Sequence, residues 1–461
     1  MPATIYLTDV LACPRCDKAP LAPEGDSYRC QGCKTGFPSI SGIPWLFADP
    51  ESSLGEWRNR LQFELQRLSH ETHRCEAALR ASDLSPLARR RLERQASATA
   101  NHRKELQALL APLGVQAEAA PRESHLALRT RLPLDQALDT YYPNVHRDWA
   151  WGEEENRASL AQVQRALEAT GGTHDLGDTL VLGAGAARLA YDLHMELRPA
   201  NTLALDFNPL LLLIAQEVMS GGRLELHEFP TAPVTLDDFA VTRLLAAPAP
   251  VREGFHYVLA DVLRAPFRPG AFDLVVTPWL IDIVTEDLVM FGARINRLLK
   301  RGGRWVNFGS LAFASPDRAR RYSAEETLAI AEGAGFDPPA SHDAVIPYMC
   351  SPASRHGRCE RVFTFAAVKS ADVKPAPRHK ALPDWLVVGN EPVPLLPSFR
   401  TQAVSTRIYS FIMSLIDGRR SIADMAKVFE ERKLMTRKEA APAIRGFLIR
   451  MYDDAQRKSE F

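Results

Sequence analysis

The sequence predicts an α/β protein built around one doubly wound, Rossmann-like domain, with a cysteine-rich ribbon before it and a helical module after it. Two Cys-x-x-Cys pairs within the first 33 residues indicate the ribbon. Apolar strands that end at glycines or carboxylates between residues 179 and 310 indicate the central domain. Short amphipathic helices that begin at capping-box residues indicate the C-terminal module. At roughly 150 residues per domain, a chain of 461 residues fits this organisation.

Charge and hydropathy narrow the classes of partner. Lys and Arg together number 56, as do Asp and Glu, so the formal net charge is zero. Because non-specific affinity for nucleic acid depends on basic charge, nucleic acid is not an expected partner. The longest apolar run, residues 210–215, is too short to span a bilayer, and no basic segment precedes an apolar core at the N-terminus. We therefore expect no membrane association, no signal peptide and a cytoplasmic location.

The N-terminal cysteines have the spacing of a metal site. Cys13 and Cys16 form one Cys-x-x-Cys pair, and Cys30 and Cys33 form the second after thirteen intervening residues. Each pair forms a tight turn that directs two sulfurs to one point, so the two turns complete a tetrahedral thiolate shell for Zn²⁺. Four protein ligands leave no open position, which indicates a structural metal. The alternative is a pair of redox-active dithiols.

The same stretch resembles the zinc ribbon of the tRNA-methyltransferase activator family. The resemblance covers about 40 residues and depends on Cys-Pro-Arg-Cys, on Cys-Gln-Gly-Cys and on the Phe-Pro-Ser-Ile-Ser-Gly-Ile-Pro run at 37–44. It implies a zinc ribbon over residues 1–50. Because relatives of this ribbon accompany methyltransferases, it also favours that enzyme class.

Residues 51–138 are predicted to form a helical linker region of two or three helices. Trp57, Leu61, Leu65 and Leu68 recur at helical spacing and define a buried face. The basic cluster at residues 89–91 could contact RNA, but a solvent-exposed helix face is the simpler interpretation.

The central domain begins with a glycine-rich turn after an apolar strand. The segment at 179–191 reads TLVLGAGAARLAY, so Gly183 and Gly185 allow a ligand to approach the backbone closely before a helix begins near residue 187. A second apolar strand ends at Asp206, about twenty residues further on, where a carboxylate can bind ribose hydroxyls. Together these features suggest an adenosine-containing ligand.

Two more strands extend this pattern. Asp261 and Val262 follow a third strand, and a fourth strand runs from Asp273 to Thr277 and Pro278. A helix that stops at residues 302–303 and a fifth strand come next. This order resembles that of class I S-adenosylmethionine-dependent methyltransferases, which implies such a domain over residues 139–370. In that family the second acid, here Asp261, lies beside the adenine amino group.

The core is also similar to the carnosine N-methyltransferase family over about 230 residues. The motifs that carry the similarity are Asn144 to Trp149, Gly183 to Gly185 with Arg188 to Ala190, Leu226 to Phe229, Leu280 to Asp282, Asn307 to Leu311 and Cys359 to Val362. The resemblance implies that Arg147 pairs with the methionine carboxylate of the cofactor, assisted by Asn144. It places Asp206 at the ribose, Asp261 and Val262 at the adenine, and Thr277 near the methionine end. It implies that Asp282 holds the acceptor imidazole and is the catalytic residue.

The acceptor side departs from that family. A substrate-side histidine would fall near Ala314, and two tyrosines would fall near Gly357 and Cys359, so three pocket groups are missing. A different polar loop occupies residues 351–356, which counts against carnosine itself. The histidines at 146, 227, 256 and 342 show no metal-ligand spacing, and we expect them to be ordinary buried or solvent-facing residues.

The C-terminal part is predicted to be a proline-rich linker over residues 371–397 followed by a helical module over 398–461. An apolar stripe runs from Ile408 to Ile416, and the segments that start at Ser421 and Thr436 resemble capping boxes. The module resembles winged-helix or PqqD-like domains, which bind DNA, peptides or partner proteins. A plain helical cap on the catalytic domain is an equal alternative.

These features predict an S-adenosylmethionine-dependent methyltransferase that N-methylates an imidazole-containing small molecule or peptide and carries a structural zinc ion. A protein partner could bind through the ribbon or the C-terminal module. Two alternatives stay open: an RNA- or protein-modifying methyltransferase, and a non-catalytic scaffold with the methyltransferase fold.

Overall fold

The computed structural model describes residues 2–81, 83–115, 138–313, 315, 317–379 and 392–457. It separates into two compact units, residues 1–379 and 380–461, and each is described here by itself. The boundaries expected within the chain, at residues 50, 138, 370 and 397, stay predictions. Residue 314, where the family histidine is missing, lies outside the described residues.

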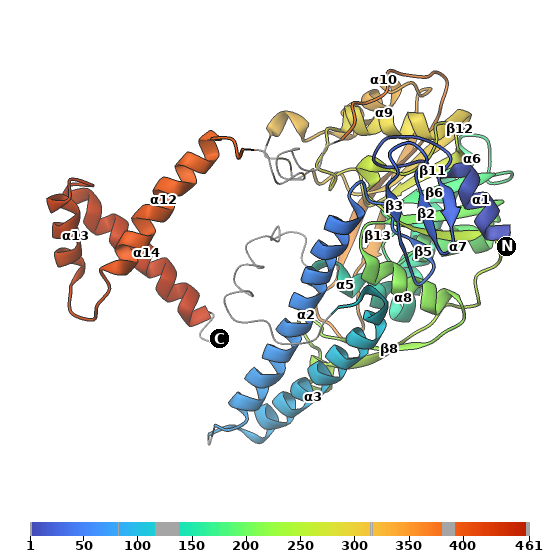
Figure 1. Ribbon diagram of the computed structural model, residues 1–461. Coiled ribbons are helices and arrows are strands. Elements are labelled where there is room, and N and C mark those ends of the chain that lie inside the picture. Colours follow the sequence, from blue (N-terminus) through green and yellow to red (C-terminus); the bar gives the residue numbers. More distant parts are fainter. Residues whose placement is uncertain are drawn as a thin grey trace. The chain divides into compact units, whose positions relative to one another are not determined.

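A seven-stranded sheet forms the centre of the first unit (Figure 1). Its strands are β6 (Asp178–Leu182), β7 (Asn201–Asp206), β10 (Phe255–Leu259), β11 (Phe272–Pro278), β12 (Leu299–Gly309), β13 (Ala340–Tyr348) and β14 (Arg358–Val368). The spatial order is β10-β7-β6-β11-β12-β14-β13. Strand β14 pairs antiparallel with both neighbours, and the other pairings are parallel. The order reverses beside β6, so ligands are expected at the carboxyl ends of the strands next to it.

Helices cover both faces of this sheet, which confirms the doubly wound α/β class. They are α5 (Leu138–His146), α6 (Glu153–Glu168), α7 (Arg188–Leu197), α8 (Pro209–Met219), α9 (Leu288–Leu298) and α10 (Ala324–Gly333). Alternate strand residues enter two separate cores, as the pleat requires. Val181 packs in the core that contains α6, α7 and α8, whereas Leu180 and Leu182 pack in the core that contains α9 and α10.

One boundary differs from the sequence prediction. The helix expected to stop at the glycines at 302–303 ends at Leu298, and strand β12 already begins at Leu299. Leu299 has extended backbone angles (φ −82°, ψ 142°), and the pairing of β11 with β12 shifts register between Phe272 and Leu274. The two glycines therefore lie within an irregular part of the strand, and they do not end the helix.

The N-terminal ribbon packs on the β10 edge of the sheet. It comprises α1 (Pro2–Val10), β1 (Ala22–Glu24), β2 (Ser27–Arg29), β3 (Gly36–Phe37), β4 (Ser39–Ile40) and β5 (Ile43–Pro44). The amide of Leu46 donates to the carbonyl of Leu259 at 2.7 Å, and the amide of Ala12 donates to the carbonyl of Pro266 at 2.8 Å. Trp45 is fully buried in this contact. The ribbon is therefore part of the same compact unit as the sheet.

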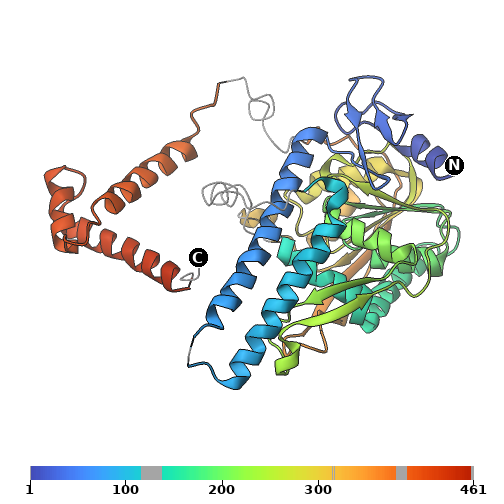
Figure 2. The same ribbon diagram turned by 60° about the horizontal axis from the view of Figure 1, so that its bottom comes forward.

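Two long helices form a hairpin after the ribbon, as Figures 1 and 2 show. They are α2 (Pro50–Ala78) and α3 (Pro86–Leu109), and the short helix η1 (Ala111–Leu113) follows. The predicted stripe at Trp57, Leu61, Leu65 and Leu68 is buried, as expected. No helix in the described segments, even these two, has the length and apolar content that a membrane span requires.

A two-stranded antiparallel sheet lies beside α3. It consists of β8 (Leu224–Glu228) and β9 (Val241–Leu245), with the short helix η3 (Leu236–Phe239) between them. The basic cluster of α3 contacts this region: Arg90 pairs with Asp237 at 2.9 Å, and the guanidinium of Arg91 lies 5.1 Å from the ring centre of Phe239. These two arginines therefore interact with the protein itself.

The described part of the second unit, residues 392–457, contains three helices, α12 (Pro397–Ser414), α13 (Ile422–Glu431) and α14 (Arg437–Arg457). Ser421 and Asp424 form the predicted capping box of α13. Thr436 donates to Glu439 at 2.7 Å through its hydroxyl at the start of α14. Ile412 and Leu415 of the predicted stripe are buried in the helical core, whereas Ile416 is exposed.

Candidate active site

The carboxyl end of β6 carries the glycine-rich loop. Gly183 and Gly185 adopt positive φ angles of 70° and 59°, which side chains other than glycine disfavour. The amides of Gly183 and Ala184 both donate to the carbonyl of Leu205, at 2.9 and 3.0 Å. A Cβ at residue 183 would lie 2.9 Å from Leu280 Cδ1. The loop is therefore packed tightly between the ends of β7 and β11.

Asp206 ends β7 directly beside that loop. Its carboxylate accepts the amide of Gly185 at 2.7 Å and the amide of Asn208 at 2.8 Å. Its side chain is largely buried, and this burial raises the pKa of Asp206 to about 6 despite the two hydrogen bonds. The carboxylate oxygens have further lone pairs with which they can accept the hydroxyl groups of a ligand.

Asp261 lies at the end of the neighbouring strand. Leu259 of β10 is paired with Asp206 of β7, which brings the two acids to adjacent strand ends. Asp261 caps the short helix η4 (Val262–Arg264) by accepting the amide of Leu263 at 2.9 Å, and burial raises its pKa. Val262 is half-buried beside it and packs against the adjacent apolar core.

Arg147 begins a π-helical turn, η2 (Arg147–Trp151), directly after α5. Its guanidinium pairs with Asp148 at 2.7 Å and with Glu155 at 3.2 Å. Burial alone would lower the pKa of Arg147, but these two carboxylates raise it above its usual value. Glu155 also accepts the amide of Met349 at 2.7 Å, so it ties this turn to the loop after β13.

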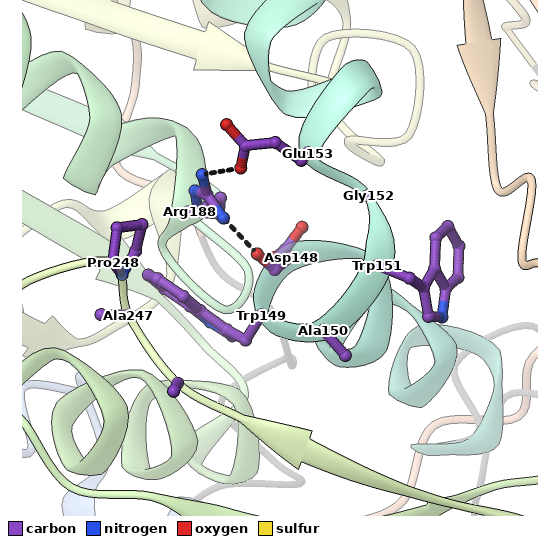
Figure 3. A pocket seen from close by; sticks show the side chains of 10 residues that line it. Asp148, Trp149, Ala150, Trp151, Gly152, Glu153, Arg188, Ala247 and Pro248 are labelled. Carbon is purple, nitrogen blue, oxygen red and sulfur yellow. Dashed lines mark hydrogen bonds and ion pairs between the residues drawn. The ribbon is translucent and has the colours of Figure 1, made fainter.

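The π-helical turn is bound to the glycine-rich loop. Trp149 donates its indole N–H to the carbonyl of Ala186 at 2.9 Å, and Arg188 donates to the carbonyl of Asp148 at 2.8 Å. Figure 3 shows Arg188 between Asp148 and Glu153, on the wall of a small cavity of about 160 Å³. The structure thus brings the π-helical turn that begins at Arg147 into contact with the end of the glycine-rich loop at Ala186 and Arg188.

Asp282 follows β11 on a turn. Its carboxylate accepts a short hydrogen bond from the hydroxyl of Ser310 and one from the amide of Ala312 at 3.0 Å. The residue is only 7% exposed. The turn is fixed at Trp279, which has a φ of 49° and donates its amide to the carbonyl of Phe308 at 2.7 Å. Asp282 is therefore held in one orientation between the ends of β11 and β12.

Two other predicted site residues, Thr277 and Asn144, do not lie with Asp206 and Asp261 at the ends of β7 and β10. The side chain of Thr277 is fully buried, accepts the indole N–H of Trp305 at 3.0 Å and donates to the side-chain oxygen of Asn307 at 3.1 Å. It therefore points into the protein interior. Asn144 is half-buried on α5, three residues before Arg147.

Several residues at this site were absent from the sequence prediction. Glu155, Asp148 and Tyr348 surround Arg147, and the ring of Tyr348 lies 4.8 Å from that of Trp279. A partial signal exists for Glu155, because it belongs to the acidic first turn of α6. Tyr348 has no comparable local signal, because only the β13–β14 pairing brings it near.

The loop at residues 351–356 is attached to a distant segment. The backbone amide of Arg355 donates to the carbonyl of Ala232 at 2.7 Å, and its guanidinium donates to the carbonyl of Val234 at 3.0 Å. His356 is exposed. Arg355 therefore interacts with backbone carbonyls, whereas His356 stays accessible to solvent.

The four N-terminal cysteines converge on one point. Their sulfurs all lie within 4.8 Å of one another. Cys13 Sγ lies 3.6 Å from Cys33 Sγ, and Cys16 Sγ lies 3.5 Å from Cys30 Sγ. A tetrahedral zinc ion with bonds of about 2.3 Å separates its sulfurs by about 3.8 Å. The donor set and its spacing therefore fit a Zn²⁺ ion.

Comparisons with known proteins bear on the central domain. The model of the carnosine N-methyltransferase family matches residues 130–354. No curated protein sequence matches the chain.

Solved structures show weaker likenesses. Haemonchus contortus phosphoethanolamine N-methyltransferase 2, in complex with phosphomonomethylethanolamine and S-adenosylhomocysteine, is 16% identical with a TM-score of 0.33, over 52% of this chain and 59% of that one. A methyltransferase from Bacillus halodurans is 13% identical with a TM-score of 0.33, over 46% of this chain and 100% of that one. A chain of the Haloferax volcanii complex between the Trm112 methyltransferase activator and a methyltransferase is 15% identical with a TM-score of 0.34, over 51% and 98%. Our chain thus spans 59% of the length of the first of these proteins, and TM-scores this low support no conclusion about activity.

The family match confirms the resemblance on which the predicted enzyme class depends. Residues 130–354 include the glycine-rich loop, both strand-end acids, Arg147 and Asp282. This part of the chain is similar to the carnosine N-methyltransferase family.

Proposed function

We propose that this protein is an S-adenosylmethionine-dependent methyltransferase that transfers the methyl group to a nitrogen of an imidazole-containing small molecule or peptide. The observation that carries the proposal is the carboxylate of Asp282. It is nearly buried, and both of its hydrogen-bond donors, Ser310 and Ala312, come from the segment after β12. An anion fixed in this way suits an acceptor that carries an N–H group and becomes positively charged when it reacts.

The cofactor would bind along the carboxyl ends of β6, β7 and β10. Asp206 would accept the ribose hydroxyls, and Asp261 and Val262 would contact the adenine. Arg147 would bind the methionine carboxylate with guanidinium N–H groups beyond those used by Asp148 and Glu155, because a guanidinium carries five. Asn144, half-buried on α5, would assist Arg147. Thr277 would contribute through its backbone, since its hydroxyl is engaged in the interior.

Bound S-adenosylmethionine supplies a methyl group on a positively charged sulfur. The lone pair of the acceptor nitrogen attacks the methyl carbon in line with the C–S bond, which breaks and leaves S-adenosylhomocysteine. The protein contributes mainly alignment and charge. Asp282 would accept the N–H of one imidazole nitrogen and so orient the other nitrogen towards the methyl group. The same carboxylate would stabilise the positive charge that spreads over the ring as the N–C bond forms, and it would then take the N–H proton from the methylated ring and pass it to solvent.

Substitution of Asp282 tests this assignment. In Asp282→Asn we expect unchanged affinity for S-adenosylhomocysteine and a fall in turnover of about 10²- to 10⁴-fold, the range typical of a lost acid–base or charge-stabilising group. Calorimetry and a methyl-transfer assay on histidine-containing dipeptides provide the two readouts. Ser315→Ala, an exchange on the same segment outside the contacts of Asp282, is the matched control. Full activity of Asp282→Asn would contradict the assignment.

Calorimetric titration with S-adenosylhomocysteine also distinguishes the proposed enzyme from a non-catalytic scaffold. Micromolar binding of S-adenosylhomocysteine is expected, and the absence of binding by folded protein would favour a non-catalytic scaffold. If the cofactor binds but no imidazole compound is methylated, an RNA or protein acceptor becomes the better hypothesis.

We also propose that Cys13, Cys16, Cys30 and Cys33 hold a structural zinc ion. A closed four-thiolate shell would stabilise the ribbon against the β10 edge of the sheet. The ribbon or the C-terminal module would be the place for a protein partner, and pull-down with each part deleted in turn would test this.

A further inference from the structure

We propose that His102, Glu105 and His227 form a second metal site that binds a divalent ion of the zinc type. The ligand atoms of the three side chains all lie within 4.8 Å of one another. His102 is only 3% exposed and His227 only 6%, whereas Glu105 is half-buried at the rim. Two imidazoles and one carboxylate are a donor set that Zn²⁺ prefers.

The fold brings the three ligands together from two elements. His102 and Glu105 are three residues apart on α3, so they share one face of that helix. His227 lies on β8, 122 residues beyond Glu105. Its Nδ1 is 3.2 Å from Glu105 Oε2. Two ligand atoms of a tetrahedral zinc ion with bonds of about 2.0–2.1 Å lie about 3.4 Å apart, so this pair already has suitable spacing.

The ring nitrogens of the two histidines are engaged in different ways. His102 Nδ1 is buried and makes no hydrogen bond within the part of the chain that the structure describes. A buried polar atom without a partner carries an energetic cost that a metal ion would remove. The other nitrogen of His227, Nε2, lies 3.4 Å from the hydroxyl of Thr242, a contact that fixes the ring with Nδ1 towards Glu105.

Aromatic rings enclose the cluster. The ring of His102 lies 4.9 Å from that of Tyr142 and 5.7 Å from that of Phe229, measured between centroids. Tyr142 also donates its hydroxyl to the carbonyl of His227 at 3.2 Å. Three protein ligands leave one position of a tetrahedral ion for a water molecule, and the aromatic rings limit the access of larger molecules to it.

A metal ion here would cross-link the helical hairpin to the methyltransferase domain. It would connect α3 to β8, and Tyr142 of α5 lies against both. Helix α5 leads directly into Arg147. The ion would therefore stabilise the wall beside the proposed cofactor site without contacting the cofactor.

Zinc analysis of the full chain after equilibration with buffered Zn²⁺ tests the site. We expect His102→Ala and Glu105→Gln each to lose one zinc ion per chain relative to the wild type. His174→Ala, which removes an exposed histidine outside the cluster, is the matched control and should lose none. Glu105→Gln keeps both histidines and changes only a half-buried group, so it keeps the test valid if His102→Ala does not fold. Unchanged zinc content in a folded Glu105→Gln or His102→Ala variant would overturn the proposal, leaving a metal-free Glu105–His227 pair.

Cobalt(II) separates this site from the cysteine cluster. A site of nitrogen and oxygen ligands gives visible d–d bands, and thiolate ligands add charge-transfer absorption in the near ultraviolet. We expect His102→Ala to lose part of the visible absorption while it keeps all of the thiolate absorption. Loss of both, or of neither, would contradict a separate second site. If the wild type shows no thiolate absorption at all, the ribbon assignment fails while the histidine site is still tested by its own bands.

Discussion

The two candidate metal clusters differ in how their ligands are distributed along the chain. Cys13, Cys16, Cys30 and Cys33 lie within 21 residues, and two local turns bring them together. The ligands at 102, 105 and 227 come from a helix and a strand that the sequence separates by more than a hundred residues. Local turns are encoded by spacing, whereas the packing of α3 against β8 is decided by the whole fold. A single sequence can therefore reveal a site whose ligands are brought together by local turns more readily than one whose ligands come from distant elements.

The largest expected effect concerns the cysteine cluster. We expect Cys30→Ser to lose one zinc ion and to unfold residues 13–37, because structural zinc supplies about 10–16 kcal/mol in small zinc-dependent domains. Amide hydrogen exchange of that segment measures the loss. Cys350→Ser, an exposed cysteine outside the cluster, should leave exchange unchanged. Retained protection in Cys30→Ser would show that packing against β10 alone folds the ribbon, and the contrast between the two clusters would then weaken.

A smaller effect is expected at the histidine cluster, because α3 and β8 already pack through apolar residues. Free zinc at 100 times its dissociation constant should stabilise the first unit by about 2.7 kcal/mol. Thermal unfolding with and without buffered Zn²⁺ would show this as a shift in the apparent Tm. The shift should be smaller in His227→Ala than in His174→Ala, because zinc in the cysteine cluster stabilises both variants equally. An equal shift in both variants would assign the stabilisation to another site.

The acids at the carboxyl ends of β7 and β10, Asp206 and Asp261, differ from both metal clusters. They are distant in sequence, as the ligands of the histidine cluster are, and yet the sequence pointed to both. The sequence places Asp206 and Asp261 after strands and assigns them to the ribose and adenine of one ligand, and the pairing of β7 with β10 brings these strand ends together. Arg147 was named only by family resemblance, and its partners Asp148 and Glu155 were missed. No sequence pattern predicts that a π-helical turn packs against a glycine-rich loop. In this protein the hydrogen bonds of Trp149 and Arg188 hold the two together.

Three further features of the structure were not evident from local sequence patterns. The assignment of Thr277 to the methionine end of the cofactor stays a prediction, and alternation along β11 directs its hydroxyl towards Trp305 and Asn307. The helix before β12 was expected to reach Gly302, but glycine is compatible with an irregular strand as well as with a helix end. The sequence alone gives no sign that His227 lies beside His102 and Glu105, because these two residues belong to α3 and lie outside the central domain.

A pH titration tests the strand-end site. Burial raises the pKa of Asp206 to about 6, so the carboxyl group is largely protonated at pH 5 and largely ionised at pH 7. If only the ionised form accepts the ribose hydroxyls, affinity for S-adenosylhomocysteine should fall by about tenfold from pH 7 to pH 5. Calorimetry at several pH values measures it. In Asp206→Asn the affinity should be lower at pH 7 and should depend less on pH; an unchanged pH profile would exclude Asp206 as the source.

The smallest expected effect links the histidine cluster to α5. Tyr142→Phe removes the hydrogen bond to the carbonyl of His227 and should destabilise the first unit by about 1 kcal/mol. If a metal ion already holds β8, the loss should be smaller with zinc than without it. Urea unfolding in the two conditions gives the difference. Equal losses would indicate that the hydrogen bond and the metal act independently.

The bond between Asp206 and Gly185 has a kinetic consequence. The carboxylate of Asp206 accepts the amide of Gly185 in the glycine-rich loop at 2.7 Å, and the amide of Asn208 donates to its other oxygen at 2.8 Å. We expect these bonds within the protein to order the loop during folding, so that binding of a ligand costs less conformational entropy. Cofactor association at this edge should proceed in a single concentration-dependent phase, at a rate set by diffusional encounter and not by loop rearrangement.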